Sequence, residues 1–389
     1  MQILCVHQGY ELYGSDRTFI SSLLALRNRY SDANISVVLP REGDLSRTLL
    51  DMGFQVTLRE LWVLRKANGI RKNIVRLLAL PFHVLRAMRE LRSYTLVYIN
   101  TSVIFDYALA SRFSSCASIL HIHEIPTGLA MHLIKTIIHA TTAVLVYNSA
   151  ATKRAFGLSD DRRQFVLHNG IPDQSPTASR QPFSDDASKA CLLLIGRIND
   201  WKGQDLLVDA VAALPAAHRA ILSIKFAGAS FEEGPETGRL VAKVREAALE
   251  TQVDFEGFVK DPADLYQWAD VVVVPSKKPE PFGLVAVEAM AHARPVIGAD
   301  HGGLTEIIVD KQTGLLFTPR DATALAKALQ FALDEPDTMR AFGICGRERY
   351  LKDFTEDHYK EHFLRIVEKA INKLTDSSRE RPANLGSDR

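Results

Sequence analysis

The loop that follows a β-rich run at 191–195 carries two cations. Its sequence is GRINDWKGQD, so Arg197 and Lys202 lie five residues apart and Gly196 frees the backbone at the end of the expected strand. Fixed positive charge at such a loop could stabilise a diphosphate leaving group, which gains negative charge as its bond to a sugar breaks. The alternative is that the cations form a surface ion pair with Asp200 or Asp205.

A second loop, SKKPEPFGLVAVEAM, carries two carboxylates. Pro281 and Gly283 interrupt the chain before an expected helix, so free backbone N–H groups of this loop could contact an anion. Glu288 lies about one turn into that helix among apolar neighbours, so it needs hydrogen-bond donors such as ribose hydroxyls. Glu280, at the mouth of the loop, could accept hydrogen bonds from sugar hydroxyls.

Other candidates are weaker when taken alone. Gly14 and Ser15 follow the first expected strand, at the beginning of a helix. His123 ends another strand and could bind the transferred sugar or organise the acceptor, although a strand-end histidine is commonly structural. Gly302 and Gly303 permit a tight loop that brings backbone N–H groups near a donor, or a plain turn.

No Asp-x-Asp occurs anywhere in the chain. Nothing in the sequence therefore indicates a divalent metal that bridges a diphosphate, and we expect neither a metal nor a cofactor. In that case the cationic pair stabilises the diphosphate.

Short β-rich runs alternate with longer helical patterns, which is typical of βαβ units and a parallel sheet. One series of strands is expected at 3–6, 35–39, 54–58, 96–99, 119–122, 143–147 and 165–167, and a second at 191–195, 224–227, 253–256, 271–275, 296–298 and 315–317. We therefore predict an α/β protein with two doubly wound, Rossmann-like domains that face each other across a cleft.

The domain boundaries follow from the same pattern. The first domain is predicted at 1–171 and the second at 190–354, with a polar, Pro/Ser-rich linker at 172–189. An amphipathic helix at 355–374 is expected to complete the first domain, and the tail at 375–389 to be disordered.

Length and composition agree with this organisation. The 389 residues suit two domains, and 47% apolar with 24% charged residues is typical of a folded globular protein. The four cysteines, Cys5, Cys116, Cys191 and Cys345, form no Cys-x-x-Cys pair and are expected to be reduced and buried. Neither a signal-like beginning nor a long apolar run is present, so we expect a cytoplasmic protein.

Positive charge is concentrated in the first half of the chain. Residues 1–180 hold 21 Lys/Arg and 13 Asp/Glu, whereas residues 181–389 hold 26 and 33. The segment 65–92 has eight cations, a single acid (Glu90) and many bulky apolar residues. It could lie on the anionic inner face of a membrane, hold a charged acceptor, or be an ordinary amphipathic helix. Nucleic acid is not expected, because no reader motif accompanies the segment.

Together these motifs resemble the GT-B fold, family-4 retaining glycosyltransferases, also called group 1. The resemblance covers nearly the whole chain and is strongest in GRINDWKG and in EPFGLVAVE, the paired-glutamate motif. HNGI at 168–171, EGFV at 256–259 and GGLTE at 302–306 follow in the family's order. Tyr13 departs from the pattern, since the family usually has a Gly-Gly pair where this chain has Tyr13 and Gly14.

Carried over to this chain, the resemblance implies a role for each matching residue. Arg197 and Lys202 would bind the diphosphate, and Glu280 with the backbone at 282–284 would hold the donor sugar and phosphate. Glu288 would bind ribose, Val259 would lie near the base, and His123 would lie near the transferred sugar. The catalytic candidates are therefore His123, Glu280, Arg197 and Lys202. Retention of anomeric configuration is implied by the resemblance alone.

The favoured hypothesis is a metal-independent transfer of sugar from a UDP- or GDP-sugar to a saccharide or lipid-linked acceptor, in cell-surface polysaccharide or glycolipid synthesis. A sugar-nucleotide epimerase and a non-catalytic donor-binding subunit are the alternatives. A glycosidase would use two carboxylates but needs no Arg197, Lys202 or helix-end anion site. A NAD-dependent oxidoreductase is disfavoured because no G-x-G-x-x-G follows an early strand.

Overall fold

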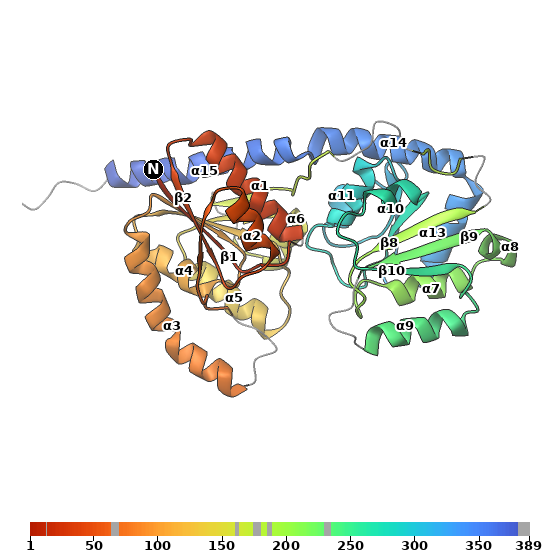
Figure 1. Cartoon of the computed structure of the whole chain (residues 1–389), viewed down its shortest axis with the longest axis horizontal. Coiled ribbons are helices and arrows are strands. Elements are labelled where there is room, and N and C mark those ends of the chain that lie inside the picture. Colours follow the sequence, from red (N-terminus) through yellow and green to blue (C-terminus); the bar gives the residue numbers. More distant parts are fainter. Residues whose placement is uncertain are drawn as a thin grey trace, which may run out of the picture. The chain divides into compact units, whose positions relative to one another are not determined.

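The computed structural model describes residues 1–12, 14–63, 70–159, 163–173, 180–184, 189–228 and 235–379. The chain divides into two compact units, each with its own sheet (Figure 1). Unit 1 comprises Met1–Asn169 together with the chain from Tyr359 onward, and unit 2 comprises Gly170–His358. Parts of the segments predicted as linker (172–189) and as tail (375–389) lie outside the described residues.

Unit 1 is built on a seven-stranded sheet in the order β3-β2-β1-β4-β5-β6-β7, in which every neighbouring pair is parallel. The strands are β1 (Gln2–His7), β2 (Asn34–Leu39), β3 (Gln55–Leu58), β4 (Leu96–Asn100), β5 (Ala117–Ile122), β6 (Val144–Tyr147) and β7 (Gln164–Val166). The helices of this unit are α1 (Gly14–Arg29), α2 (Asp44–Asp51), α3 (Ile70–Leu91), α4 (Phe105–Ala110), η1 (Ser111–Phe113), α5 (Leu129–Ala140) and α6 (Ala150–Phe156).

Helices cover both faces of this sheet. Because successive side chains of a strand point to opposite faces, its strands contribute to two separate cores. In β1, Ile3 and Cys5 belong to a core with residues of α1 and of α15 (Glu356–Arg379). Leu4 and Val6 belong to the other core, with residues of α4 and α5. Figure 1 shows α15 on one side of the sheet and α3 to α5 on the other.

Unit 2 has a six-stranded sheet in the order β10-β9-β8-β11-β12-β13, again with parallel neighbours. The strands are β8 (Ala190–Ile195), β9 (Leu222–Ala227), β10 (Val253–Gly257), β11 (Val271–Val274), β12 (Val296–Ala299) and β13 (Gly314–Phe317). The helices are α7 (Gln204–Ala212), α8 (Ala216–Ala220), α9 (Pro235–Glu246), α10 (Ala263–Trp268), α11 (Leu284–Ala291), α12 (Leu304–Ile307), α13 (Ala322–Asp334) and α14 (Pro336–Asp353).

The prediction of two doubly wound parallel sheets is confirmed, and all thirteen expected strands occur close to their predicted bounds. The strand order reverses between β1 and β4 in unit 1 and between β8 and β11 in unit 2. In open α/β sheets ligands bind beyond the carboxyl ends of the strands at such switch points. The loops after these four strands are therefore the places to look for a site.

Helix α15 begins one residue after the predicted position and continues past residue 374, so 375–379 are helical rather than part of a disordered tail. Its expected apolar face is buried at Phe363, Ile366, Val367 and Ala370. These residues share a core with β1 and β4 of unit 1.

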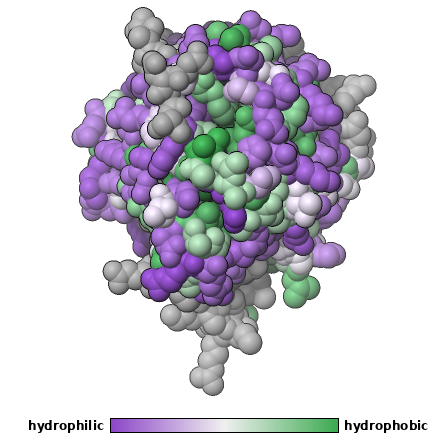
Figure 2. Space-filling model, turned by 90° about the vertical axis from the view of Figure 1, so that its right-hand side faces the viewer, coloured by the Kyte–Doolittle hydropathy of each residue, from purple (hydrophilic) through white to green (hydrophobic). Residues whose placement is uncertain are grey.

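The expectation of four buried cysteines is wrong at two positions. Cys5 and Cys116 are buried, but Cys191 is only half-buried and Cys345 is exposed. Within the part of the chain that the structure describes, no helix is both long and apolar enough to cross a membrane. Figure 2 shows one face of the molecule, on which apolar residues gather in the middle of a largely hydrophilic surface.

Candidate functional site

The loop after β8 is held in shape by its own polar residues. The Asn199 side-chain oxygen accepts hydrogen bonds from the backbone N–H groups of Trp201 (3.1 Å) and Lys202 (3.0 Å). Gln204, at the start of α7, donates from Nε2 to the carbonyls of Gly196 and Arg197. An asparagine that binds backbone N–H groups two and three residues onward fixes a tight turn. The turn sets the direction of the Lys202 side chain.

Lys202 and Glu280 meet across the switch point of unit 2. The Nζ atom of Lys202 lies 2.7 Å from Oε1 of Glu280, and the Ser276 hydroxyl donates to the same oxygen over 2.5 Å. Ser276 is buried and Glu280 is 6% exposed, so the carboxylate lies inside the loop rather than at its mouth as predicted. Burial strengthens an ion pair and makes the loss of either partner costly.

The alternative of a surface ion pair is wrong for Lys202, which pairs with Glu280. Asp205 forms its ion pair with Lys277, whose Nζ atom lies 2.8 Å from Oδ2. Lys277 also donates its backbone N–H to the Trp201 carbonyl over 2.7 Å, which ties the loop after β11 to the loop after β8. The two loops predicted to carry chemistry are therefore held together by ion pairs and a backbone hydrogen bond.

Gly302 packs against the backbone of Glu280. It has a φ of +64°, and a Cβ atom there would lie 2.5 Å from the Glu280 carbonyl oxygen and 2.7 Å from its nitrogen. The neighbouring Gly303 donates its N–H to the Glu280 carbonyl over 2.8 Å. The glycine pair thus supports the loop that carries Glu280, although the sequence predicted it as a source of N–H groups for a ligand.

Glu288 lies in α11 as expected and is half-buried. The Tyr266 hydroxyl, from α10, donates to its Oε2 atom over 2.6 Å, and the Tyr266 ring stacks on His292 with centroids 5.1 Å apart. The protein itself therefore supplies one of the hydrogen-bond donors that the Glu288 carboxylate needs. Tyr266 was not predicted, because nothing in the local sequence connects α10 with α11.

The remaining predicted residues of unit 2 lie around these two loops. Arg197 follows β8 and is half-buried, and Val259 follows β10 and packs against the core. Phe282 is buried, whereas Gly283 and Leu284 are half-buried at the start of α11. The N-cap residue of this helix, Gly283, makes no side-chain cap hydrogen bond.

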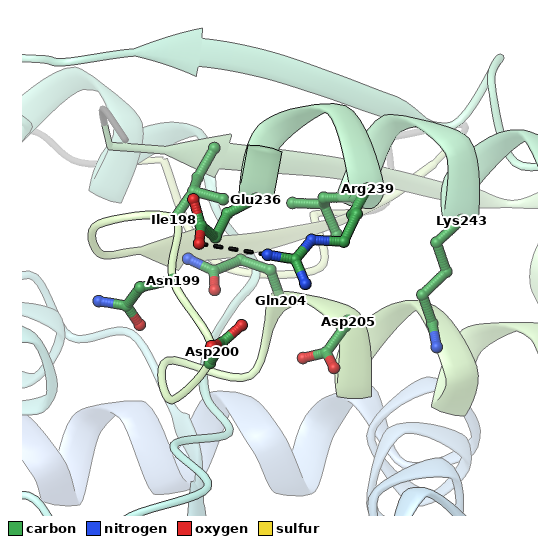
Figure 3. Close-up of a pocket in the computed structure, with 9 residues that line it drawn as sticks. Ile198, Asn199, Asp200, Gln204, Asp205, Glu236, Arg239 and Lys243 are labelled. Atoms are coloured by element: carbon green, nitrogen blue, oxygen red, sulfur yellow. Dashed lines mark hydrogen bonds and ion pairs between the residues drawn. The ribbon is translucent and has the colours of Figure 1, made fainter. Parts of the chain in front are cut away.

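Figure 3 shows a pocket of about 200 Å³ on the α7 and α9 side of the loop after β8. Its lining includes Asn199 and Gln204, which shape that loop, and an ion pair of 3.2 Å between Glu236 and Arg239. None of the predicted donor-binding residues lines the pocket. Opposite charges that already neutralise each other give it no evident preference for an anion.

His123 lies in unit 1, in a buried polar cluster at the carboxyl ends of β1, β4 and β5. Its Nε2 atom lies 2.8 Å from Oδ1 of Asn100, and its ring lies 4.0 Å from that of His121. Burial and the neighbouring His121 hold the pKa of His123 well below its usual value, and burial lowers the pKa of His121 to about 3. Both histidines are therefore neutral at physiological pH.

Gly14 and Ser15 begin α1 as predicted, but the loop before them is organised by an unpredicted residue, Asp16. Its carboxylate accepts hydrogen bonds from the backbone N–H groups of Glu11 (3.2 Å) and Leu12 (2.9 Å), and from Nε2 of His7 (2.7 Å). Asp16 could have been found from the sequence, since an acidic residue in the first turn of a helix often binds the preceding backbone.

Among the residues described, no three His, Cys, Asp or Glu side chains are grouped so that they could hold a metal ion. The predicted site residues divide between the two units: Gly14, Ser15 and His123 in unit 1, and Arg197, Lys202, Val259, Glu280, Phe282, Gly283, Leu284 and Glu288 in unit 2. Within each unit they lie beyond the carboxyl ends of the strands.

The chain was compared with known proteins. Residues 177–349 match the family described as glycosyl transferases group 1. Glycogen synthase of Mycobacterium tuberculosis is 34% identical over 194 residues, 49% of this chain and 44% of that protein. D-inositol 3-phosphate glycosyltransferase of Jonesia denitrificans is 36% identical over 207 residues, 51% of this chain and 47% of that protein. The aligned region spans less than half the length of these two relatives.

Solved structures share the fold over most of the chain. Anabaena Alr3699/HepE, in complex with UDP and glucose, superposes with a TM-score of 0.77 at 22% identity, covering 95% of this chain and 99% of that one. Sucrose-phosphate synthase of Thermosynechococcus elongatus gives 0.73 at 22% identity, with 96% and 99% covered. Residues 177–349 thus resemble the group 1 glycosyl transferases, and the chain shares the GT-B fold with these solved structures.

Proposed function

We propose that this protein transfers a sugar from a nucleoside diphosphate sugar to an acceptor hydroxyl, with retention of anomeric configuration and without a metal ion. The observation that carries the proposal is the ion pair of Lys202 with the buried Glu280, in the loop that also contains Arg197, at the switch point of unit 2 and within the region that matches the family.

The proposed chemistry follows from the charges of this loop pair. Arg197 and Lys202 stabilise the negative charge that develops on the departing diphosphate, and the uncapped start of α11 adds backbone N–H groups. Glu280 binds hydroxyls of the donor sugar, and Glu288 binds the ribose. His123, a neutral and buried histidine, acts on the sugar side of the reaction.

Absence of a metal requirement is proposed because the sequence contains no Asp-x-Asp, while two cations accompany the loops expected to bind diphosphate. Retention is proposed on the family resemblance. UDP is the first nucleotide to test, since HepE was solved with UDP-glucose, and GDP is the second. A role in cell-surface polysaccharide or glycolipid synthesis would give a saccharide or lipid-linked acceptor.

The test is a panel of UDP-, GDP- and ADP-sugars, each assayed with a chelator for thermal stabilisation and slow donor hydrolysis. One nucleotide sugar should stabilise the protein and release its nucleotide, and Lys202→Met should abolish the release. Anomeric configuration is then read by NMR on the product. No stabilisation by any donor would contradict the proposal, as would turnover that requires added Mg²⁺ or Mn²⁺.

The same assays separate the alternatives. An epimerase would change the stereochemistry of the donor sugar in the absence of an acceptor. A non-catalytic subunit would be stabilised by nucleotide without any release or transfer.

Helix α3 supports a second proposal, that unit 1 binds an anionic membrane surface. Leu78, Phe82 and Leu85 are 78%, 70% and 52% exposed, and their spacing of four and three residues places them on one face of the helix. Arg89 continues this stripe one turn further, and Arg92 follows it; both are exposed. Apolar side chains that enter the lipid beside cations that meet anionic headgroups are typical of peripheral binding.

Co-sedimentation with vesicles tests this second proposal. We expect binding to phosphatidylglycerol vesicles at low salt, weaker binding at high salt, and little to pure phosphatidylcholine. Phe82→Ser with Leu85→Ser, and separately Arg89→Gln with Arg92→Gln, should each reduce the bound fraction. Phe113→Ser is the matched control, because Phe113 is 67% exposed in η1 and lies outside the stripe. Equal loss in this control would overturn the assignment to α3.

A further inference from the structure

Asn100 is the centre of the buried polar cluster in unit 1. It ends β4, at the switch point, and is completely buried. Its Oδ1 atom accepts from the Tyr98 hydroxyl (2.7 Å) and lies 2.8 Å from Nε2 of His123. Its Nδ2 atom lies 3.0 Å from Nδ1 of His7 and 3.4 Å from the Ser15 carbonyl.

These contacts define which way the amide points. The Ser15 carbonyl can only accept a hydrogen bond, so the NH₂ group of Asn100 must face it. The side-chain oxygen then faces Tyr98 and His123. The Ser15 carbonyl is the contact that fixes this orientation, because the Tyr98 hydroxyl and the imidazole nitrogens can each donate or accept.

The amide orientation in turn determines the tautomer of His123. Because the Asn100 oxygen can only accept, Nε2 of His123 must carry the proton. A neutral imidazole has one N–H, so Nδ1 carries the lone pair. Nδ1 is buried and has no hydrogen-bond partner among the residues that the structure describes.

We propose that Asn100 is a positioning residue that holds His123 as the Nε2–H tautomer, so that Nδ1 accepts a hydrogen bond from a hydroxyl of the bound sugar or acceptor. The tautomer follows from the contacts above, whereas the hydroxyl partner rests on the proposed function. The surroundings of His123 agree with a neutral ring: burial, then His121 and His7, lower its pKa, whereas Asp16 raises it.

The same residue links His123 with the first loop. His7, which contacts the Asn100 amide, donates from Nε2 to Asp16, and Asp16 holds the backbone of Glu11 and Leu12. Gly9 fits closely over this pair, because a Cβ atom there would lie 1.9 Å from Oδ1 of Asp16. Removal of the Asn100 amide is therefore expected to affect the His123 ring and the first loop together.

Nitrogen-15 NMR of the full-length protein with labelled histidine tests the tautomer directly, without any substrate. The His123 signals are assigned by comparison with His123→Gln. Wild-type protein should show one protonated nitrogen, Nε2, and one unprotonated nitrogen, Nδ1, from pH 6 to 8. Asn100→Ala should give a mixture of tautomers, or Nδ1–H. An unchanged Nε2–H signal in Asn100→Ala would overturn the proposal.

Asn100→Asp keeps the acceptor and nearly the same shape, in case the alanine variant does not fold. We expect it to keep Nε2–H, and the added carboxylate to raise the pKa of His123 so that the ring titrates at a higher pH than in wild type. A ring that shows Nδ1–H in this variant would contradict the proposal. Thr141→Val is the control, since Thr141 is also buried and its hydroxyl bonds Ser111 and the Ala143 N–H, which lie outside the cluster.

Kinetics then separate this inference from the proposed function. Asn100→Ala should lower kcat by about 10- to 100-fold through misplacement of His123, with the donor KM nearly unchanged. A shifted tautomer in a protein that transfers no sugar even as wild type would reject the function and retain the positioning role. A shifted tautomer with undiminished kcat would reject the use of Nδ1 in the reaction.

Discussion

At the scale of single residues, Lys202 serves two purposes that a simple alanine variant would confuse. Its ammonium neutralises the buried Glu280 carboxylate and is also the proposed partner of the diphosphate. Lys202→Ala should therefore cost about 2–3 kcal/mol of unfolding free energy, somewhat less than for a fully buried pair, because the Lys202 side chain is 19% exposed. Activity should be lost as well.

The double variant Lys202→Met with Glu280→Gln separates the two roles. It removes both charges, so most of the lost stability should return in urea unfolding while transfer stays absent. Recovery of activity together with stability would show that Lys202 is structural.

Tyr266 leads to a prediction about ribose recognition. Its hydroxyl donates to Glu288 over 2.6 Å and so orients the carboxylate proposed to bind the ribose. Tyr266→Phe keeps the ring that stacks on His292, and should weaken binding of the nucleoside diphosphate about tenfold, or about 1.4 kcal/mol. The wild-type preference for the ribonucleotide over its 2′,3′-dideoxy analogue should shrink by the same factor. An equal loss for both nucleotides would indicate a general disturbance of α11.

At the scale of elements, the strand order explains why both clusters lie where they do. Lys202 and Glu280 follow β8 and β11, and His7 and Asn100 end β1 and β4, the neighbouring strands at each switch point. The alternating pattern predicted these strands because both faces of a parallel sheet are buried and give short apolar runs. It also placed Arg197 and Lys202 in the loop that follows β8, where the structure has them.

The partners of these residues could not be predicted from the sequence. Glu280 follows Lys202 by 78 positions, and Asn100 follows His7 by 93. The sequence offered Asp200 and Asp205 as partners of the two cations because they are near in the chain, whereas in the folded protein Lys202 pairs with Glu280. Ser276, Tyr266 and Asn100 were missed because their roles depend on which loops become neighbours after folding.

Gly302 gives a prediction at this scale, because it joins the loop after β12 to the loop after β11. Gly302→Ala should destabilise the protein by about 1–3 kcal/mol and lower donor binding, since the new Cβ atom must displace the Glu280 backbone. Gly53→Ala is the matched control. Its φ of +82° carries a similar backbone cost, but no atom lies within 4 Å of the new Cβ. The free energy of unfolding and the nucleotide affinity are measured for both variants. Equal donor affinity in the two would contradict this prediction.

At the scale of the whole molecule, the stability of unit 1 is expected to depend on pH and that of unit 2 on bound nucleotide. Unit 1 contains the buried neutral histidines His121 and His123, whose pKa values lie below their values in the unfolded chain, near 6.5. As pH falls below 6.5 the unfolded chain binds protons that the folded unit does not, so stability is lost with falling pH. Asp106 opposes this between about pH 4 and 6, because burial raises its pKa to about 6. Unit 2 contains the proposed donor residues, so nucleotide should stabilise that unit.

Burial also lowers the pKa of His292 in unit 2, so we expect acid to act on both units but more strongly on unit 1, and nucleotide to act on the unfolding of unit 2. Tryptophan fluorescence distinguishes them, because Trp62 lies in unit 1 and Trp201 and Trp268 in unit 2, and Trp→Phe variants isolate each signal. A nucleotide at 100 times its Kd should add about 2.7 kcal/mol to the unit 2 transition. From pH 6 down to 4, His121→Asn should remove up to about 1.4 kcal/mol per pH unit from the slope of the unit 1 transition, and comparison with wild type at each pH cancels the Asp106 contribution. A slope unchanged by His121→Asn, or a nucleotide effect confined to the Trp62 signal, would show that the two sensitivities are not divided between the units in this way.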